Sequence, residues 1–254
     1  MRGYITAVDP AAARAAIERV RRDLGHLQAF ALRPIGELET RLVNEEDWAA
    51  AWKEHFPVLR LGRRLVIRPT WREHHAAPDE LVISLDPGMA FGTGLHPTTR
   101  LCLAGIERWA DAGLVRGASM VDVGCGSGIL AICAALFGAR EVLGVDTDPL
   151  AVETTRANAR LNGVEALITA RQGSVPLAGG TTHELVVANL VARLLVDLAP
   201  DLAAAVAAGG HLLAGGIFHD REGDVGAAFE AAGLRVVDRA AEADWLSLEA
   251  VRAG

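Results

Sequence analysis

The sequence predicts an α/β fold in which helices flank a mostly parallel sheet of seven strands, preceded by a small N-terminal α+β part. The first supporting observation is that apolar, strand-like segments alternate with amphipathic, helix-like segments from residue 81 onward. Such alternation is typical of parallel sheets, whose strands are joined by crossover helices. The second is that residues 1–43 follow a different, β-α-β-β pattern, which is too short to build an independent core of any size.

Each strand of the larger part is predicted from a short apolar run, and each helix from apolar residues that recur every three or four positions. The predicted strands cover residues 119–123, 141–146, 166–171, 184–189, 210–215, 234–239 and 245–251. The predicted helices cover residues 98–112, 129–137, 149–162, 192–207 and 221–232. In open sheets of this kind, ligands bind beyond the carboxyl ends of the strands.

The N-terminal part begins with a predicted strand at residues 3–8. Asp9 and Pro10 then supply an N-cap and a proline at the first helical position, so we expect a helix over residues 11–24. Two more strands are expected at 26–35 and 38–43. We therefore divide the chain into a small domain at 1–56, a connector at 57–80 that carries a short strand at 64–68, and the main domain at 81–254.

Composition excludes several classes of protein. The net charge is −7, which is unfavourable for sequence-independent binding to nucleic acid, where Lys and Arg must neutralise phosphates. The three cysteines form no C-x-x-C pair, so we expect no zinc site and no other metal. No apolar run reaches the roughly 18 residues of a membrane span, and we see no secretory leader. We therefore expect a cytoplasmic protein.

A glycine-rich loop follows the predicted strand 119–123. Asp122 is the next-to-last residue of the strand. Gly124, Gly126 and Gly128 follow at alternate positions, and Ile129 opens the next helix. Glycines allow the backbone to turn sharply and to approach a ligand without a Cβ in the way. A strand, a glycine turn and a helix N-terminus together form a Rossmann-like ligand cradle.

Asp146 ends the next strand, 22 residues after Gly124, where a carboxylate can accept hydrogen bonds from ribose hydroxyls. A dinucleotide site requires the spacing G-x-G-x-x-G/A. Counted from Gly124, that pattern fails because its last position is Ile129. Counted from Gly126, a degenerate match ends at Ala131. The loop alone therefore leaves a nicotinamide cofactor open as an alternative.

The string from Asp122 to Gly128 resembles the E/DxGxGxG loop of class I S-adenosylmethionine-dependent methyltransferases. The wider sequence resembles one of their families, the PrmA-type methyltransferases that modify ribosomal protein L11. The resemblance rests on four strings: DPGMAFGTGLHPTT at 86–99, DVGCGSGILAI at 122–132, GVDTDPLAVETTRANARLNGV at 144–164 and VVANLVARLL at 186–195. Upstream, the segment 46–71 resembles the connector of that family. The resemblance covers residues 44–254, whereas residues 1–43 match only in outline, as a small ferredoxin-like lobe.

The resemblance implies S-adenosylmethionine as cofactor and S-adenosylhomocysteine as product. It also implies that the N-terminal α-amine and lysine ε-amines of L11 are the acceptors, and that the small lobe recognises this protein substrate. The residues expected to bind the cofactor are Phe91, Gly92, Thr93, Thr98, Thr99, Asp122, Gly124, Gly126, Asp146, Thr147, Asn189 and Leu190. Thr98 and Thr99 are also expected to cap the helix 98–112.

Asn189 ends the fourth strand of the main sheet, and we expect it to act as the catalytic residue that orients the amine. The sequence Asn189-Leu190 lacks the Pro-Pro-Tyr that follows this asparagine in many enzymes that methylate flat amides or bases. Neither His96 nor His219 is expected to be a dedicated base, and Trp245 is expected in the core. Residues 215–219 are expected to line the substrate entrance.

Three alternatives to protein methylation remain open at the level of sequence. The same fold could act on a small-molecule amine, with the N-terminal lobe as a lid. The glycine loop could bind a nicotinamide cofactor in an oxidoreductase. The chain could also be a non-catalytic binding module that retains the fold.

Overall fold

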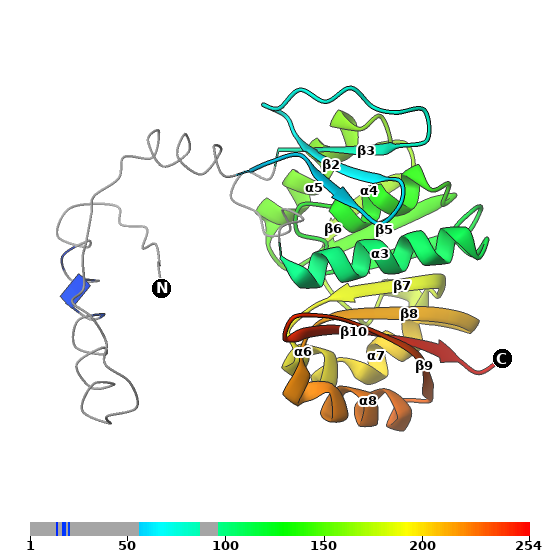
Figure 1. Cartoon of the computed structure of the whole chain (residues 1–254). Coiled ribbons are helices and arrows are strands. Elements are labelled where there is room, and N and C mark those ends of the chain that lie inside the picture. The colour runs from blue at the N-terminus through cyan, green and yellow to red at the C-terminus, as the bar shows by residue number, and fades with distance from the viewer. Residues whose placement is uncertain (1–13, 15–16, 19, 21–55, 87–95) are drawn as a thin grey trace. The chain divides into compact units, whose positions relative to one another are not determined.

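A computed structural model describes residues 14, 17, 18, 20, 56–86 and 96–254 (Figure 1). The chain divides into two compact units, Met1–His55 and Phe56–Gly254. In the first unit the four described residues are helical, and all four belong to the helix predicted at 11–24. The strands predicted at 3–8, 26–35 and 38–43 lie outside the described residues.

The second unit begins with a three-stranded sheet. Its strands are β1 (Leu59–Leu61), β2 (Leu65–Pro69) and β3 (Leu81–Leu85). Strand β2 lies in the middle, antiparallel to β1 and parallel to β3. Residues 57–80, which the sequence suggests as a connector with one strand, thus contain two. Leu65 and Ile67 are buried in the same core cluster as Ile106 and Ile132 of the main domain, so this segment is part of the second unit.

The main sheet has seven strands, as predicted. They are β4 (Ser119–Val123), β5 (Glu141–Asp146), β6 (Ile168–Gln172), β7 (His183–Asn189), β8 (Val206–Phe218), β9 (Leu234–Glu242) and β10 (Trp245–Arg252). Their order is β6-β5-β4-β7-β8-β10-β9. Strands β4 to β8 run parallel, and β10 is antiparallel to both of its neighbours. Because the chain moves from β4 to β5 on one side and returns to β7 on the other, β4 and β7 flank the topological switch point.

Helices cover both faces of the main sheet (Figure 1). They are α3 (Pro97–Asp111), α4 (Ile129–Leu136), α5 (Pro149–Leu161), α6 (Ala192–Asp197), α7 (Ala199–Ala205) and α8 (Glu222–Ala231), with short 3₁₀ turns at Ala178–Gly180 and His219–Arg221. Helices α3 and α4 pack on one face and α6 to α8 on the other. Successive strand residues alternate between these faces, so Met120 joins the first core cluster and Val121 the second.

The single helix predicted at 192–207 is wrong in detail. The segment forms two short helices, α6 and α7, and β8 begins at Val206. Pro200 occupies the first turn of α7. Its ring carries no backbone N–H, so a helix that continued from α6 would lose a hydrogen bond there. The apolar periodicity continues through the break because the buried residues of both helices join the same core cluster.

Glu107 of α3 ties the β1–β2 turn to the main domain. This buried carboxylate accepts hydrogen bonds from the backbone N–H groups of Arg63 and Arg64, each at 2.9 Å. Gly62 completes the turn with a φ of +58°, and a Cβ there would lie 1.8 Å from Glu107 Oε2. The Glu107 carboxylate therefore lies directly against the backbone of the β1–β2 turn, and Gly62 is the residue that allows this close contact.

We expect Glu107→Gln to lower the free energy of unfolding by about 2–3 kcal/mol, because an amide nitrogen cannot accept one of the two buried N–H bonds. Urea denaturation of the variant measures this loss. The exposed Glu153→Gln variant is the control and should unfold like the wild type. Equal stability of Glu107→Gln and wild type would show that the carboxylate does not hold the turn.

Candidate functional site

The glycine loop lies at the carboxyl end of β4. Gly124, Gly126 and Gly128 all have positive φ, at 78°, 53° and 79°. The N–H groups of Gly124 and Cys125 donate to Val145 O of the neighbouring strand β5, at 2.8 and 3.1 Å. A Cβ on Gly124 would lie 2.5 Å from Leu190 Cδ2. Backbone conformation and space thus both require glycine here.

Asp146, at the end of β5, holds the other side of the loop. Its Oδ2 accepts from the N–H of Gly126 at 3.0 Å, and its Oδ1 accepts from the N–H of Asp148 at 3.0 Å. A carboxylate oxygen can accept two hydrogen bonds. The half-buried Asp146 carboxylate therefore keeps acceptor capacity on both oxygens, as a contact to a pair of ribose hydroxyls requires.

Asp122 is fully buried beneath the same loop. Neither of its carboxylate oxygens has a hydrogen-bond partner among the residues that the structure describes. Burial raises the pKa of the Asp122 carboxyl to about 7, the nearby backbone N–H of Ala131 opposes this rise in part, and the negative charge of Asp146 adds to it. A buried acidic group without a partner is costly and suits a site that receives a cationic ligand group.

The first turn of α3 lies against the end of β7. Thr98 and Thr99 are buried, and the Asn189 side-chain amide donates to Thr99 Oγ1 at 3.4 Å. The residue that caps α3 is His96, so the expectation that Thr98 and Thr99 cap it is wrong. His96 Nδ1 accepts from the N–H of Thr98 at 3.4 Å, and Pro97 occupies the first helical position. The two threonines are thereby left inside the helix, where Thr98 Oγ1 lies 2.8 Å from His96 Nδ1 and Thr99 Oγ1 accepts from Asn189.

Leu190 connects the end of β7 to the glycine loop and to β8. Its side chain lies where a Cβ on Gly124 would be, and its carbonyl oxygen lies 2.0 Å from where a Cβ on Gly216 would be. Gly216 has a φ of +83°. The backbone after β7 therefore packs directly against the backbone of β8, which places Asn189 and Leu190 at the switch point.

The structure thus brings most of the expected site residues to one edge of the sheet. These are Thr98, Thr99, Asp122, Gly124, Gly126, Asp146, Asn189 and Leu190. Thr147 is exposed beside them, and its carbonyl accepts from the Gln172 side chain at 3.1 Å. Phe91, Gly92 and Thr93 lie outside the described residues. The roles of all these residues stay predictions.

An aromatic cluster borders this edge and was not predicted as a unit. Trp245 lies edge-on to His96, with ring centroids 4.9 Å apart, and edge-on to Phe218 at 5.4 Å. His219 lies 4.5 Å from Phe218. Trp245 is half-buried and does not belong to the core cluster that was expected for it. No local sequence signal joins His96 to Trp245, because only the α3–β10 packing brings them together.

Two side chains of α5 also reach the loop. Thr155 Oγ1 donates to Gly126 O at 3.0 Å, and the Asn158 amide donates to Ser127 O at 2.8 Å. Both residues are buried. The available signal was their spacing of three, which puts two polar residues on the helix face that also carries the buried Ala151 and Val152.

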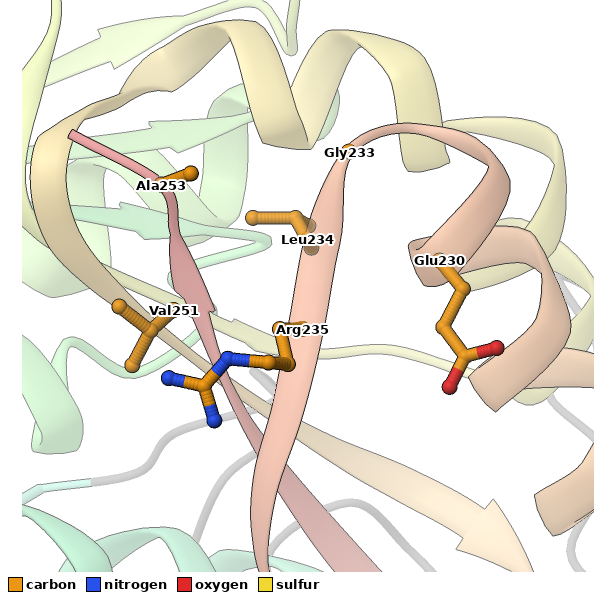
Figure 2. A pocket seen from close by; sticks show the side chains of 6 residues that line it. All are labelled: Glu230, Gly233, Leu234, Arg235, Val251 and Ala253. Carbon is orange, nitrogen blue, oxygen red and sulfur yellow. The ribbon is translucent and has the colours of Figure 1, made fainter.

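A hollow of about 440 Å³ lies elsewhere, lined by Glu230, Gly233, Leu234, Arg235, Val251 and Ala253 (Figure 2). It is formed where β9 begins and β10 ends. Val251 pairs with His211 near the start of β8, so the hollow is at the edge of the sheet opposite the glycine loop. It contains none of the expected site residues.

The described part of the chain has neither a metal-binding cluster nor a membrane-spanning helix. No group of three or more His, Cys, Asp or Glu side chains there is arranged to hold a metal ion. Among the helices that the structure describes, none combines the length and the apolar character needed to cross a membrane.

Comparison with known proteins is consistent over nearly the whole chain. Residues 7–253 match the family described as "Ribosomal protein L11 methyltransferase (PrmA)". Curated proteins named ribosomal protein L11 methyltransferase include one from Chloroflexus aurantiacus, 44% identical over 91% of this chain and 77% of the relative. Another from Herpetosiphon aurantiacus is 44% identical over 97% of this chain and 81% of the relative.

A solved structure agrees with these sequence matches. The crystal structure titled ribosomal protein L11 methylase from Lactobacillus delbrueckii subsp. bulgaricus is 33% identical, with a TM-score of 0.71. The match covers 78% of this chain and 99% of that one. The predicted Rossmann-like class I methyltransferase fold of the main domain is confirmed. From the order of strands, the glycine loop at the switch point and these matches, we conclude that the chain belongs to the ribosomal protein L11 methyltransferase (PrmA) family.

Proposed function

We propose that this chain transfers methyl groups from S-adenosylmethionine to the N-terminal α-amine and lysine ε-amines of ribosomal protein L11. The observation that carries the proposal is family membership across residues 7–253, supported by relatives of that name at 44% identity. The carboxyl edge of the sheet agrees with it, since Asp122 and Asp146 flank a glycine loop there. The alternative of a nicotinamide-dependent oxidoreductase is disfavoured, because the matching family is one of methyltransferases.

The residues at this edge fit the proposed cofactor. The glycine at position 124 lets the loop pack against Leu190 at the end of β7, because a Cβ there would lie 2.5 Å from Leu190 Cδ2. Asp146 keeps free acceptor positions for ribose hydroxyls, and the buried Asp122 offers negative charge without a partner among the described residues. When bound, S-adenosylmethionine supplies an activated methyl group on a positively charged sulfur.

The protein's part in the reaction is to bind, to orient and to desolvate the amine. A lysine ε-amine must be neutral to attack, which costs about 4–5 kcal/mol near pH 7 for an ordinary lysine. A pocket that excludes water lowers this cost by disfavouring the cation. We propose that Asn189, whose amide already contacts Thr99, orients the amine. Alignment of this kind needs no covalent intermediate.

The proposal also covers the role of the first unit and the cellular compartment of the reaction. We propose that residues 1–56 recognise the protein substrate, which is supported by the division of the chain into units at residues 55 and 56. Ribosomal proteins are made in the cytoplasm, so we propose that the enzyme works there. The three free, buried cysteines suit a reducing compartment.

Transfer of labelled methyl groups tests the proposed substrate. The protein is incubated with methyl-labelled S-adenosylmethionine and, in parallel, with L11, with L11 whose amines are acetylated, and with free lysine. We expect label on L11 alone, because acetylation removes the nucleophilic amines. Label on free lysine but not on L11 would favour the small-molecule alternative. Absence of transfer to either would favour a binding module.

Asp146→Ala is expected to weaken binding of S-adenosylhomocysteine by about 1–3 kcal/mol, because ribose hydroxyls lose their acceptor and the N–H of Gly126 loses its partner. Titration calorimetry measures the change. The Asp146→Asn variant keeps one acceptor oxygen, so its affinity for S-adenosylhomocysteine should lie between those of the wild type and Asp146→Ala. Wild-type affinity in Asp146→Ala would refute the role of this carboxylate.

A further inference from the structure

Helix α5 places polar side chains where a helix normally places apolar ones. Thr155 and Asn158 are buried, and Asn162 is half-buried at the C-terminal end of the same helix. Burial of an amide or a hydroxyl is unfavourable unless its hydrogen bonds are replaced. Each of these three side chains is hydrogen-bonded, and the partners of each include backbone atoms of one of two other segments. The polar face of α5 therefore holds those two segments in place through hydrogen bonds.

Asn158 joins the glycine loop to the end of β3. Its amide nitrogen donates to Ser127 O at 2.8 Å, and its amide oxygen accepts from the N–H of Asp86 at 3.1 Å. The backbone N–H can only donate and the carbonyl can only accept, so the two contacts fix which way the amide faces. One side chain thus bridges two segments that lie 41 positions apart in the sequence.

Asn162 makes the neighbouring contact but does not reach the loop. Its amide nitrogen donates to Ser84 O at 2.7 Å, and its amide oxygen accepts from the N–H of Ser84 at 2.8 Å. Strand β3 is at the free edge of the small sheet. Asn162 and Asn158, one helical turn apart, therefore hold Ser84 and Asp86, two residues apart on that edge.

The loop itself depends on such outside contacts. The N–H of Gly126 is held by Asp146, Gly126 O by Thr155 and Ser127 O by Asn158. Glycines populate many backbone conformations about equally, so a glycine-rich loop has little conformational preference of its own. Removing the Asn158 contact would leave the carbonyl of the Ser127–Gly128 peptide without this hydrogen bond, while the Gly128 N–H would still donate to Cys125 O at 2.8 Å. Gly128 is the left-handed residue from which α4 starts.

We propose that Asn158 is a positioning residue for the cofactor cradle. Its amide fixes the Ser127 carbonyl, and with it the shape of loop 124–128, against the end of β3. The inference rests on the proposed function, because it takes the loop to be the binding surface for S-adenosylmethionine. Asn162, which shares the helix and the strand but not the loop, supplies a matched comparison.

The test compares three variants of the full chain: Asn158→Ala, Asn158→Asp and Asn162→Ala. All three should melt below the wild type, since each loses buried or half-buried hydrogen bonds. Only the two Asn158 variants should bind S-adenosylhomocysteine about tenfold or more weakly by calorimetry, an effect of roughly 1.4 kcal/mol. The aspartate keeps an acceptor for Asp86 but cannot donate to Ser127 O, so it should resemble the alanine variant.

Kinetics separate positioning from general damage. For the Asn158 variants, KM for S-adenosylmethionine should rise while kcat at saturating cofactor changes less than KM does. Equal KM in Asn158→Ala and Asn162→Ala, at similar melting temperatures, would overturn the proposal, since it would reduce Asn158 to a structural residue.

Amide hydrogen exchange gives a readout that does not depend on the cofactor. In the cofactor-free protein, amides of residues 124–128 should exchange faster in Asn158→Ala than in Asn162→Ala, because only the former frees the loop. Equal exchange in both variants would contradict the proposal. Failure of the wild type to bind S-adenosylhomocysteine, together with the expected exchange pattern, would instead contradict the proposed function. The role of Asn158 in fixing loop 124–128 would then still hold.

Discussion

Replacing Asp122 with asparagine is expected to stabilise the cofactor-free protein at about pH 8 by up to about 4 kcal/mol. The pKa of the buried Asp122 carboxyl is raised from 3.8 to about 7, mainly by burial. Above pH 7 the folded protein therefore carries an ionised carboxylate that is better solvated in the unfolded chain. A raised pKa means that stability falls as pH rises from about 4 to about 7, and an asparagine removes this loss.

The same substitution is expected to weaken cofactor binding by about tenfold or more, because an amide offers no negative charge to a cationic ligand. Stability and binding should thus move in opposite directions, as is common for residues kept for function. Urea denaturation at about pH 6 and about pH 8 measures the change in stability, and calorimetry with S-adenosylmethionine, whose sulfur is positively charged, measures the change in binding.

Asp148→Asn is the matched control for this experiment. Asp148 is exposed and caps α5 by accepting from the N–H of Leu150 at 2.9 Å. Asparagine caps helices about as well as aspartate, so little change in stability is expected. If Asp122→Asn destabilised the protein equally at both pH values, ionisation of the buried carboxyl would not be the cause of the expected loss of stability.

The second large effect is expected for Gly216→Ala, which should lower the free energy of unfolding by about 3–5 kcal/mol. A Cβ there would lie 2.0 Å from Leu190 O, a backbone atom that cannot swing aside. The φ of +83° adds strain for any residue with a side chain. Relief of the clash must move the backbone after β7, and with it the Leu190 side chain that packs beside Gly124. We therefore expect weaker cofactor binding as well.

Gly226→Ala provides the opposite expectation in the same protein. Gly226 lies inside α8, and a Cβ there would meet nothing within 4 Å. Alanine is favoured over glycine in a helix, so this variant should gain about 0.5–1 kcal/mol. Denaturant midpoints of both variants, compared with wild type, test the pair. A Gly216→Ala protein as stable as the wild type would show that β7 and β8 are not packed as closely as described.

Local patterns were sufficient to predict most of the main domain. Strands β4 and β5 begin and end at the predicted residues, because each is a short apolar run with an aspartate at or next to its end, followed by a turn. The same signals placed Asp122 and Asp146 at neighbouring strand ends, and parallel pairing does bring them to the same edge. Asn189 joins them because β7 pairs with β4 in the same direction.

Features that depend on distant contacts could not be predicted in this way. The segment 57–80 has the composition of a connector, yet Leu65 and Ile67 of β2 are buried in the core cluster that also contains residues of α3 and α4. His96 caps α3 in place of the threonines, since Pro97 already sets the first helical position. The bridge from Asn158 to Asp86 joins residues 72 positions apart, and no local pattern encodes it.

Titration calorimetry with S-adenosylhomocysteine is the most direct test of the central claim, that a sulfur-containing nucleoside binds across the carboxyl edge of β4, β5 and β7. We predict saturable binding by the wild type, loss of affinity in Asp146→Ala, and no measurable binding of NAD(H). Binding of NAD(H) in place of S-adenosylhomocysteine, or wild-type affinity in the Asp146→Ala variant, would contradict the assignment of this site.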